Sequence, residues 1–300
     1  MGGSRELREK RLWIAGTVTP ALVLLGAVAY LPIIYAIFLS FVRKTAFSPE
    51  ISWVGLKNYL WLLAEPNMWA SLVHSIVFTV GSVFVQVAGG LTLALLLNRS
   101  FRGQGAARSL VILPYLLPTI VIGLVFKWLL NQDYGVINQV LLETGMVKMP
   151  INFFGGIHTA MYSIVGTTGW QYASFCALML MARLQAINPK LYEAAKVSGA
   201  GAFRCFLDVT LPNLKTTLFL VALLRGIWMF NKFDLIYIIT GGGPLRVTET
   251  LPIYAYRLAF EDFDFGRAAA ACTLMFIVLA VGSILYFKLF DPSKEVEVGR

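Results

Sequence analysis

The strongest constraint on the fold of this 300-residue chain is a series of long apolar stretches without a formal charge. The hydrocarbon core of a bilayer is about 30 Å thick, and a helix needs about 20 residues to cross it. Five uncharged stretches approach or exceed that length: Leu12–Val42, Pro66–Asn98, Ser109–Phe126, Met149–Ala182 and Ala268–Phe287. A sixth, Thr216–Thr240, is apolar in outline but contains Arg225, Lys232 and Asp234. The sequence therefore predicts an all-α polytopic membrane protein with six transmembrane helices.

The composition leaves no room for a separate soluble domain. Apolar residues make up 58% of the chain, and its mean hydropathy of +0.72 is far above that of ordinary globular proteins. We expect one transmembrane domain over residues 12–290, a cytoplasmic segment at 1–11 and a cytoplasmic tail at 291–300. Leu12–Val42 is too long for the apolar core of a signal peptide, so it should be retained as a span.

Lysine and arginine residues orient the predicted spans. If both termini face the cytoplasm, fifteen of these residues lie in inner segments and six lie in outer loops. Cytoplasmic loops carry an excess of Lys and Arg, so this distribution predicts that both termini are cytoplasmic. The net charge of +9 mostly reflects the same bias, and we therefore expect no nucleic-acid partner.

Residues that carry out catalysis or bind metals are scarce. Cys176, Cys205 and Cys272 have no paired spacing, and neither His74 nor His158 has a carboxylate or thiol at ligand spacing. The sequence contains no Gly-rich phosphate loop, nucleophile elbow or carboxylate pair. We therefore expect no catalytic residue, no metal site and no cofactor in this chain, and it cannot hydrolyse ATP itself.

A polar segment between two apolar runs, Leu191–Pro212, predicts a docking site for another protein. A short helix is expected over about Pro189–Val197, with Asn188 as its N-cap and the Pro as its first residue. Gly199 and Gly201 then break the chain before a second short helical piece. A loop between spans gains nothing from such structure unless something docks on it.

The segment resembles the EAA loop of bacterial binding-protein-dependent ABC importers. The resemblance is carried by Glu193, Ala194, Ala195, Gly199, Leu211 and Pro212. The sequence departs from the family pattern at Ser198, where an Asp is usual, and at Thr216, where a second Pro often follows. The resemblance implies that residues 183–215 form a coupling loop whose helix fits a groove of a cytoplasmic ATPase.

Further motifs resemble the carbohydrate-type permeases of this family, specifically the larger maltose-type subunit. These motifs are Trp53–Tyr59, Ile112–Thr119, Phe230–Pro244, Thr248–Pro252 and Ala259–Ala270. The resemblance implies a type I ABC importer permease fold in a bacterial inner membrane and a carbohydrate or carbohydrate-like solute. It also implies a second homologous permease, two ATPase subunits that bind ATP and Mg²⁺, and a periplasmic or lipid-anchored solute-binding protein.

A substrate site is expected near the bilayer midplane, where transporters place interrupted helices and inward-facing polar groups. Three predicted spans, centred near Pro118, Gln171 and Trp228, carry such groups within about one helical turn of their centres. The family's sugar-contacting positions, carried across by motif, fall on the same spans. The predicted substrate-binding residues are Tyr115, Thr119, Thr168, Gln171, Tyr172, Arg225, Trp228, Met229 and Lys232.

Each of these residues also has a structural alternative. Aromatic and Met stripes often serve helix packing, whereas aromatic faces beside Gln, Thr and Tyr suit sugar recognition. A cation near the midplane costs at least ~2.5 kcal/mol, so Arg225 and Lys232 should each have a partner. That partner is an anionic group of the solute, Asp234 or the second permease.

An ion-coupled secondary transporter is the main alternative function. It would need titratable carboxylates within its spans, and Asp234 is the only one. A membrane-embedded enzyme would need a catalytic constellation, which the sequence lacks. We therefore expect a permease subunit, and not an enzyme, of an ATP-driven ABC importer for a carbohydrate or carbohydrate-like solute.

Overall fold

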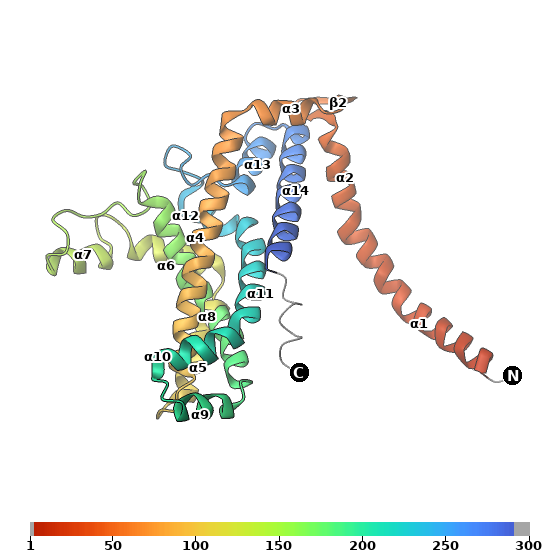
Figure 1. The fold of residues 1–300 in the computed structure, drawn as a ribbon. Helices are drawn as coiled ribbons and strands as arrows, with labels where there is room; N and C mark the ends of the chain where they lie inside the picture. Colours follow the sequence, from red (N-terminus) through yellow and green to blue (C-terminus); the bar gives the residue numbers. More distant parts are fainter. Residues whose placement is uncertain (1–2, 291–300) are drawn as a thin grey trace. The chain divides into compact units, whose positions relative to one another are not determined.

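A computed structural model describes residues 3–290, which are mostly helical (Figure 1). The predicted tail at 291–300 and the first two residues of the predicted segment at 1–11 lie outside the described residues. The chain divides into two compact units. The first unit contains residues 3–66 and 255–276, and the second contains residues 67–254 and 277–290.

The first unit begins with a long apolar helix. α1 (Gly3–Leu25) and α2 (Leu31–Ser40) are joined without a break by a π-helical stretch at Gly26–Tyr30. Within Trp13–Ser40, the most apolar 18-residue window has a mean hydropathy of 2.5, and none of its residues is buried. The stretch predicted at Leu12–Val42 is therefore confirmed as a candidate span. Most of its apolar surface is exposed, and near its end Phe38 contacts the ring of Trp53.

An antiparallel hairpin follows α2 and departs from the all-α prediction. β1 (Val42–Thr45) pairs with β2 (Ser48–Trp53). The side-chain amide of Asn58 donates to the carbonyl oxygens of Ser40 and Val42 at 2.9 and 3.0 Å. These strands are short and carry few apolar residues, so the hydropathy pattern gave no signal for them.

Three helical segments complete the first unit. They are α3 (Lys57–Ala64), residues 255–260 of α13 (Leu251–Phe260) and residues 265–276 of α14 (Phe265–Leu289). Gly266 allows the close approach of α14 to the hairpin, because a Cβ at this position would lie 2.3 Å from the carbonyl oxygen of Val42. The hairpin is thus fixed by close backbone packing as well as by hydrogen bonds.

The second unit is a helical bundle around α4 and α8 (Figure 1). Its helices are α4 (Pro66–Leu97), α5 (Gln104–Leu116), α6 (Thr119–Leu129), α7 (Val136–Glu143), α8 (Ala160–Gln185), α9 (Pro189–Val197), α10 (Ala202–Cys205), α11 (Leu211–Phe230), α12 (Asp234–Thr240), the first turn of α13 and residues 277–289 of α14. A π-helical stretch, Phe206–Thr210, joins α10 to α11. Gly90 brings α4 against α8, since a Cβ there would lie 2.4 Å from Cβ of Cys176.

The predicted span Ser109–Phe126 is a broken helix in the structure. α5 and α6 meet at an angle of 95° across Leu117 and Pro118. Proline disfavours the helical conformation of the residue before it, and Leu117 accordingly has ψ 138°. Pro118 also has no N–H to continue the helical hydrogen bonds.

One other predicted boundary was wrong. The stretch Thr216–Thr240 is interrupted between α11 and α12. Its span begins at Ala202, because the helix continues through charged residues that the search for uncharged stretches excluded. The stretch Met149–Ala182 becomes helical at Ala160, and α8 (Ala160–Gln185) agrees with the predicted span centred near Gln171. Residues 149–159 form turns and loop instead.

The number of membrane spans is confirmed only in part. Among the described residues, four helical stretches are long and apolar enough to cross a membrane: Trp13–Ser40, Pro66–Leu97, Ala202–Phe230 and Phe265–Leu289. The bent α5–α6 pair is a fifth candidate. α8 has 26 residues, fourteen of them buried, and its Thr and Gln residues reduce its hydropathy. These polar residues face other helices, so the composition of α8 resembles that of a protein core.

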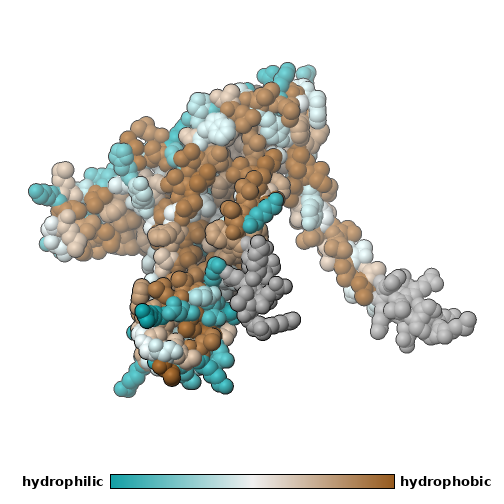
Figure 2. Space-filling view, in the orientation of Figure 1, coloured by the Kyte–Doolittle hydropathy of each residue, from teal (hydrophilic) through white to brown (hydrophobic). Residues whose placement is uncertain are grey.

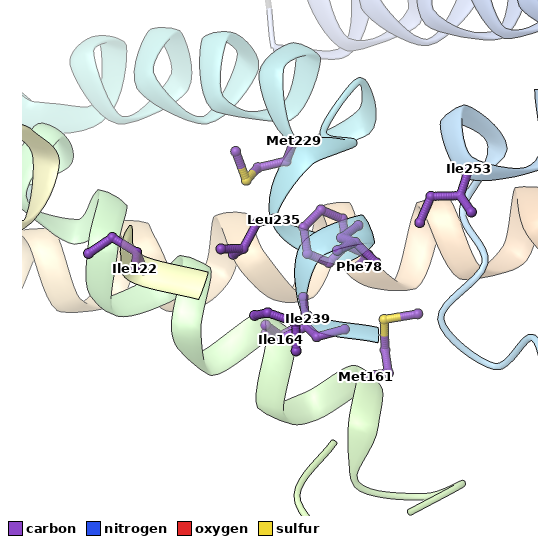
Figure 3. Packing of buried hydrophobic residues seen from close by; sticks show 10 residues of the cluster. Phe78, Ile122, Met161, Ile164, Met229, Leu235, Ile239 and Ile253 are labelled. Atoms are coloured by element: carbon purple, nitrogen blue, oxygen red, sulfur yellow. The ribbon is translucent and has the colours of Figure 1, made fainter. Parts of the chain in front are cut away.

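The core of the second unit has two parts. In the first, Phe78 of α4, Ile164 of α8 and Met229 of α11 pack with Leu235 and Ile239 of α12 (Figure 3). In the second, the end of α4 packs with the end of α8, the π-helical stretch before α11 and the start of α11 through Ala94, Leu180, Leu184, Val209 and Leu214. Figure 2 shows apolar residues over the visible surface of α4 and hydrophilic residues around α9. The second core therefore connects α8 to the segment that contains α9.

Candidate functional site

An aromatic cluster forms where α5, α8 and α11 meet. The ring centroid of Tyr115 lies 6.1 Å from that of Tyr172 and 5.6 Å from that of Phe175. The ring of Trp228 lies 5.6 Å from Phe175. Tyr115 and Trp228 are 38% and 42% exposed. The cluster thus offers open aromatic surface that a ligand or a partner helix can cover.

Arg225 lies behind this cluster and is almost fully buried. Its Nε donates to Oε1 of Gln86 on α4 at 2.7 Å, and its guanidinium carbon lies 4.1 Å from the ring centroid of Tyr172. It also lies within 6 Å of the ring centroids of Phe175 and Trp228. No described carboxylate forms an ion pair with this guanidinium. Cation–π contacts and an amide oxygen therefore stabilise the buried charge.

Gln86 also connects Arg225 to Met229. Its Nε2 donates to the sulfur of Met229 at 3.2 Å. Sequence reasoning missed Gln86, although it is a strongly polar residue in the interior of an otherwise apolar stretch. Such a residue in a membrane helix needs a partner. Phe175 was also missed, because nothing distinguishes it from an ordinary packing residue.

Lys232 has a different environment at the break between α11 and α12. Its Nζ lies 2.9 Å from Oδ1 of Asp234 and donates to the hydroxyl of Tyr172 at 2.7 Å. It also donates to Oγ1 of Thr119 at 3.5 Å, at the start of α6. The structure thus contains the Lys232–Asp234 ion pair, one of the alternatives left open by the sequence. The Lys side chain is 11% exposed and the Asp side chain 49%.

Thr168 differs from the other predicted site residues because it does not face the cluster of open aromatic rings. Thr168 is buried and its hydroxyl lies 2.9 Å from that of Ser82 on α4, so its polar group is used in helix packing. Gln171, one turn further along α8, is also buried, but its Oε1 has no hydrogen-bond partner among the described residues. A buried amide oxygen without a partner is costly, which makes Gln171 a candidate for an external donor.

Several of these residues lie at helix ends and not at the centres of spans. Trp228 is near the end of α11, Lys232 is just beyond it, and Thr119 begins α6. The prediction that Trp228 marks the middle of a span was therefore wrong. The cluster lies instead where two helices are interrupted beside the middle of α8, an arrangement that exposes polar groups inside a bundle.

The predicted coupling segment is helical where the sequence indicated. α9 covers Pro189–Val197, and Oδ1 of Asn188 accepts a hydrogen bond from the backbone N–H of Lys190 at 3.0 Å. The helix ends before Gly199, which has φ +80°, a conformation that favours glycine. The hydroxyl of Tyr192 lies 3.0 Å from that of Thr210 and fixes the helix to the start of α11.

The two faces of this segment have different environments. Glu193, Ala194 and Gly199 are exposed, whereas Ala195 is partly buried. Leu211 and Pro212 form the first turn of α11, where the Leu is partly buried and the Pro is exposed. Large apolar side chains are exposed alongside: Leu191, Val197 and Phe203. An exposed apolar helix face of this kind suits a helix-in-groove contact.

Comparison with known proteins gives consistent matches. The family described as "Binding-protein-dependent transport system inner membrane component" matches residues 86–296. The trehalose/maltose transport system permease protein MalF of Thermococcus litoralis is 34% identical over 285 residues, which cover 95% of this chain and 94% of that protein. The sulfoquinovosyl glycerol transport system permease protein SmoG of Agrobacterium fabrum is 33% identical over 280 residues, 93% of this chain and 90% of that protein.

A solved structure has a similar fold. It is a bacterial alginate ABC transporter in complex with an alginate pentasaccharide-bound periplasmic protein. One of its chains matches with a TM-score of 0.81 and 19% sequence identity, and the match covers 95% of this chain and 96% of that chain. At this identity the likeness concerns the fold alone.

Proposed function

The chain belongs to the family of binding-protein-dependent transport system inner membrane components, and on this premise we propose that it forms half of the translocation pathway of its importer. It is a permease subunit of an ABC importer for a carbohydrate or carbohydrate-like solute. It is not an enzyme, because ATP hydrolysis in such importers belongs to separate subunits. The ion-coupled secondary transporter has no support from these relatives.

The main support for the proposed pathway is the cluster of aromatic and polar residues at the two helix breaks, between α5 and α6 and between α11 and α12. Tyr115 and Trp228 offer open aromatic faces that can stack on a sugar ring. Tyr172 and Lys232 supply polar groups beside them, and Gln171 supplies an unsatisfied acceptor. This combination of aromatic faces and directional polar groups suits a carbohydrate better than a purely apolar solute.

The net charge of the cluster is relevant to the charge of the sugar that it would bind. Arg225 and Lys232 contribute two positive charges and Asp234 one negative charge, which leaves one positive charge in excess. The names of the relatives include both a sulfonated glycoside and the neutral sugars trehalose and maltose. We propose that the excess charge favours a solute with an anionic group over its neutral analogue. Competition between the two in an uptake assay measures this preference.

The proposed topology has six spans. Five are the four apolar helical stretches and the bent α5–α6 pair, and the sixth is α8, whose 26 residues would extend about 39 Å. The Lys and Arg distribution supports cytoplasmic termini and a cytoplasmic coupling loop at 183–215. In this topology residues 12–290 form one permease domain in the inner membrane.

The proposed assembly follows from the surfaces that the chain leaves uncovered. A second homologous permease would close the substrate site and cover apolar helix faces. Two ATPase subunits, which bind ATP and Mg²⁺, would dock on α9 and its surrounding loop, with Glu193, Ala194 and Ala195 at the contact. A periplasmic or lipid-anchored solute-binding protein would deliver the solute. Closure of the ATPases would then move the coupling loop and switch access to the cluster.

Uptake by the reconstituted importer tests the site. Trp228→Ala should reduce uptake because it removes an open aromatic face, and Gln171→Ala should reduce it by the loss of one hydrogen bond, about 0.5–1.5 kcal/mol. Trp128→Ala is the matched control, since Trp128 is similarly exposed but forms no ring contact in the cluster. Wild-type uptake by both cluster variants would refute the proposed site while leaving the family assignment intact.

A further inference from the structure

The first unit contains a polar pocket that the proposed pathway does not use. Its volume is about 430 Å³, and it lies between β1, α3 and the first turn of α14. Its lining includes Arg43, Lys57, Arg267 and Asp264. Three cations therefore surround one cavity with a single carboxylate among them.

The carboxylate of this pocket neutralises only one of the cations. Oδ2 of Asp264 lies 3.4 Å from Nε of Arg267, and its Oδ1 accepts a hydrogen bond from the backbone N–H of the same residue. The guanidinium of Arg267 is also stacked 4.0 Å from the ring centroid of Trp61. Arg43 and Lys57 are exposed and form no ion pair with any described residue. The pocket thus has two positive charges in excess.

The walls of the pocket are fixed by the packing of the hairpin. Asn58 binds two carbonyl oxygens at the base of the hairpin, and Gly266 lets α14 approach it closely. Just after β1, the backbone N–H of Ala46 donates to the carbonyl oxygen of Phe263 at 3.0 Å. The cations are therefore arranged around a preformed cavity, which reduces the entropy lost when an anion binds.

We propose that this pocket receives the carboxylate of an Asp or Glu side chain of the solute-binding protein. A carboxylate can accept charge-assisted hydrogen bonds from Arg43 and Lys57 at once, which suits the two uncompensated charges. The lining of the pocket has two apolar residues, Val54 and Trp61, and therefore offers little surface for the acyl chain of a lipid. These features favour a protein side chain over an anionic lipid headgroup.

The position of the pocket in the chain agrees with this partner. The hairpin precedes the Pro66 end of α4, whereas the Leu97 end of α4 belongs to the region that packs with the coupling segment. The 32 residues of α4 separate these ends by about 48 Å. The proposal rests on the proposed function, in which the hairpin is an outer loop and the coupling loop is cytoplasmic.

The experiment uses the complete importer in lipid nanodiscs with its solute-binding protein. We expect Arg43→Gln/Lys57→Gln to raise the binding-protein concentration for half-maximal ATPase stimulation at least about tenfold, because two charge-assisted contacts are lost. Arg43→Lys/Lys57→Arg should retain the wild-type value because it preserves both charges. Lys44→Gln is the matched control, since Lys44 is the next residue in the strand and donates to the hydroxyl of Tyr35 outside the pocket.

Carbodiimide cross-linking gives a second measurement that does not depend on a variant. It should join the amine of Lys57 to an Asp or Glu of the binding protein in the wild-type complex. Unchanged half-saturation in the double Gln variant, or cross-links at Lys44 but not at Lys57, would overturn the proposal. So would an effect that follows the phosphatidylglycerol content of the nanodisc and not the binding protein. Lack of stimulation in the wild-type importer would instead refute the proposed function, and this inference with it.

Discussion

Replacement of Gln86 by Leu should destabilise the permease through the buried charge of Arg225. The two side chains form a 2.7 Å hydrogen bond, and both are almost completely buried. A hydrogen bond to a charged group contributes about 1.5–3 kcal/mol, and the loss of an acceptor for a buried charge costs at least that much. We therefore expect Gln86→Leu to lower the free energy of unfolding by about 1.5–3 kcal/mol.

A double-mutant cycle separates this contact from general packing. Arg225→Met alone should also destabilise, because it leaves the Gln86 amide without its donor. The double variant Gln86→Leu/Arg225→Met replaces both partners by apolar groups and should be more stable than the sum of the single effects predicts. The assay is denaturant unfolding of the permease in mixed micelles. Gln139→Leu, the same change at an exposed position of α7, is the control.

Additivity of the two single variants would refute this reasoning. Residues that do not interact give additive effects within about 0.3–0.5 kcal/mol. A coupling energy within that range would mean that the aromatic rings around Arg225 stabilise its charge without help from Gln86. The cation–π contacts, the closest at 4.1 Å, would then be the main stabilising term.

Three further predictions concern coupling to the ATPases, the Lys232–Asp234 ion pair and the dependence of this chain on its sister permease. Gly199→Ala should reduce solute-stimulated ATP hydrolysis in the assembled importer, since φ +80° costs an L-residue roughly 1–2 kcal/mol, whereas Gly201→Ala at φ −70° should retain it. Lys232→Asp/Asp234→Lys should recover part of the uptake lost in Lys232→Asp if the pair is structural, and no recovery would indicate that the ammonium contacts the solute. Expression without the sister permease should give low membrane accumulation, because the half-exposed carboxylate of Asp234 and the polar groups beside it would then face lipid, which penalises them; a stable monodisperse monomer would contradict this.

The parts of the fold that depend on local signals were predictable from the sequence. The helix Pro189–Val197 has the predicted bounds because Asn188 caps its start and Gly199 adopts the left-handed conformation beyond its end. The span at Pro66–Leu97 differs from its prediction by one residue because its composition is almost uniformly apolar. Each of these signals acts within a few residues of the structure that it specifies.

The rest depends on contacts between distant parts of the chain. The start of the span at Ala202 was not recognised because charged residues are tolerated in the end turns of a membrane helix. The role of Gln86 depends on Arg225, 139 residues away, and on the close approach of α4 to α8 at Gly90. The packing role of Thr168 likewise depends on Ser82 on the neighbouring helix. Spacing along one helix cannot show which of its faces meets which neighbour.

The two helix breaks connect the fold to the proposed pathway. Because Pro118 ends α5, Thr119 starts a helix in a new direction, and its hydroxyl comes within 3.5 Å of Lys232. Because α11 ends at Phe230, Lys232 and Asp234 lie in and after the gap and pair with each other instead of following the helix. In continuous helices, the backbone N–H and C=O groups would form hydrogen bonds within the helix, and these side chains would be distributed around the helix axis. The interruptions instead gather polar groups from three helices beside an open aromatic surface, which is the kind of arrangement on which the proposed translocation site rests.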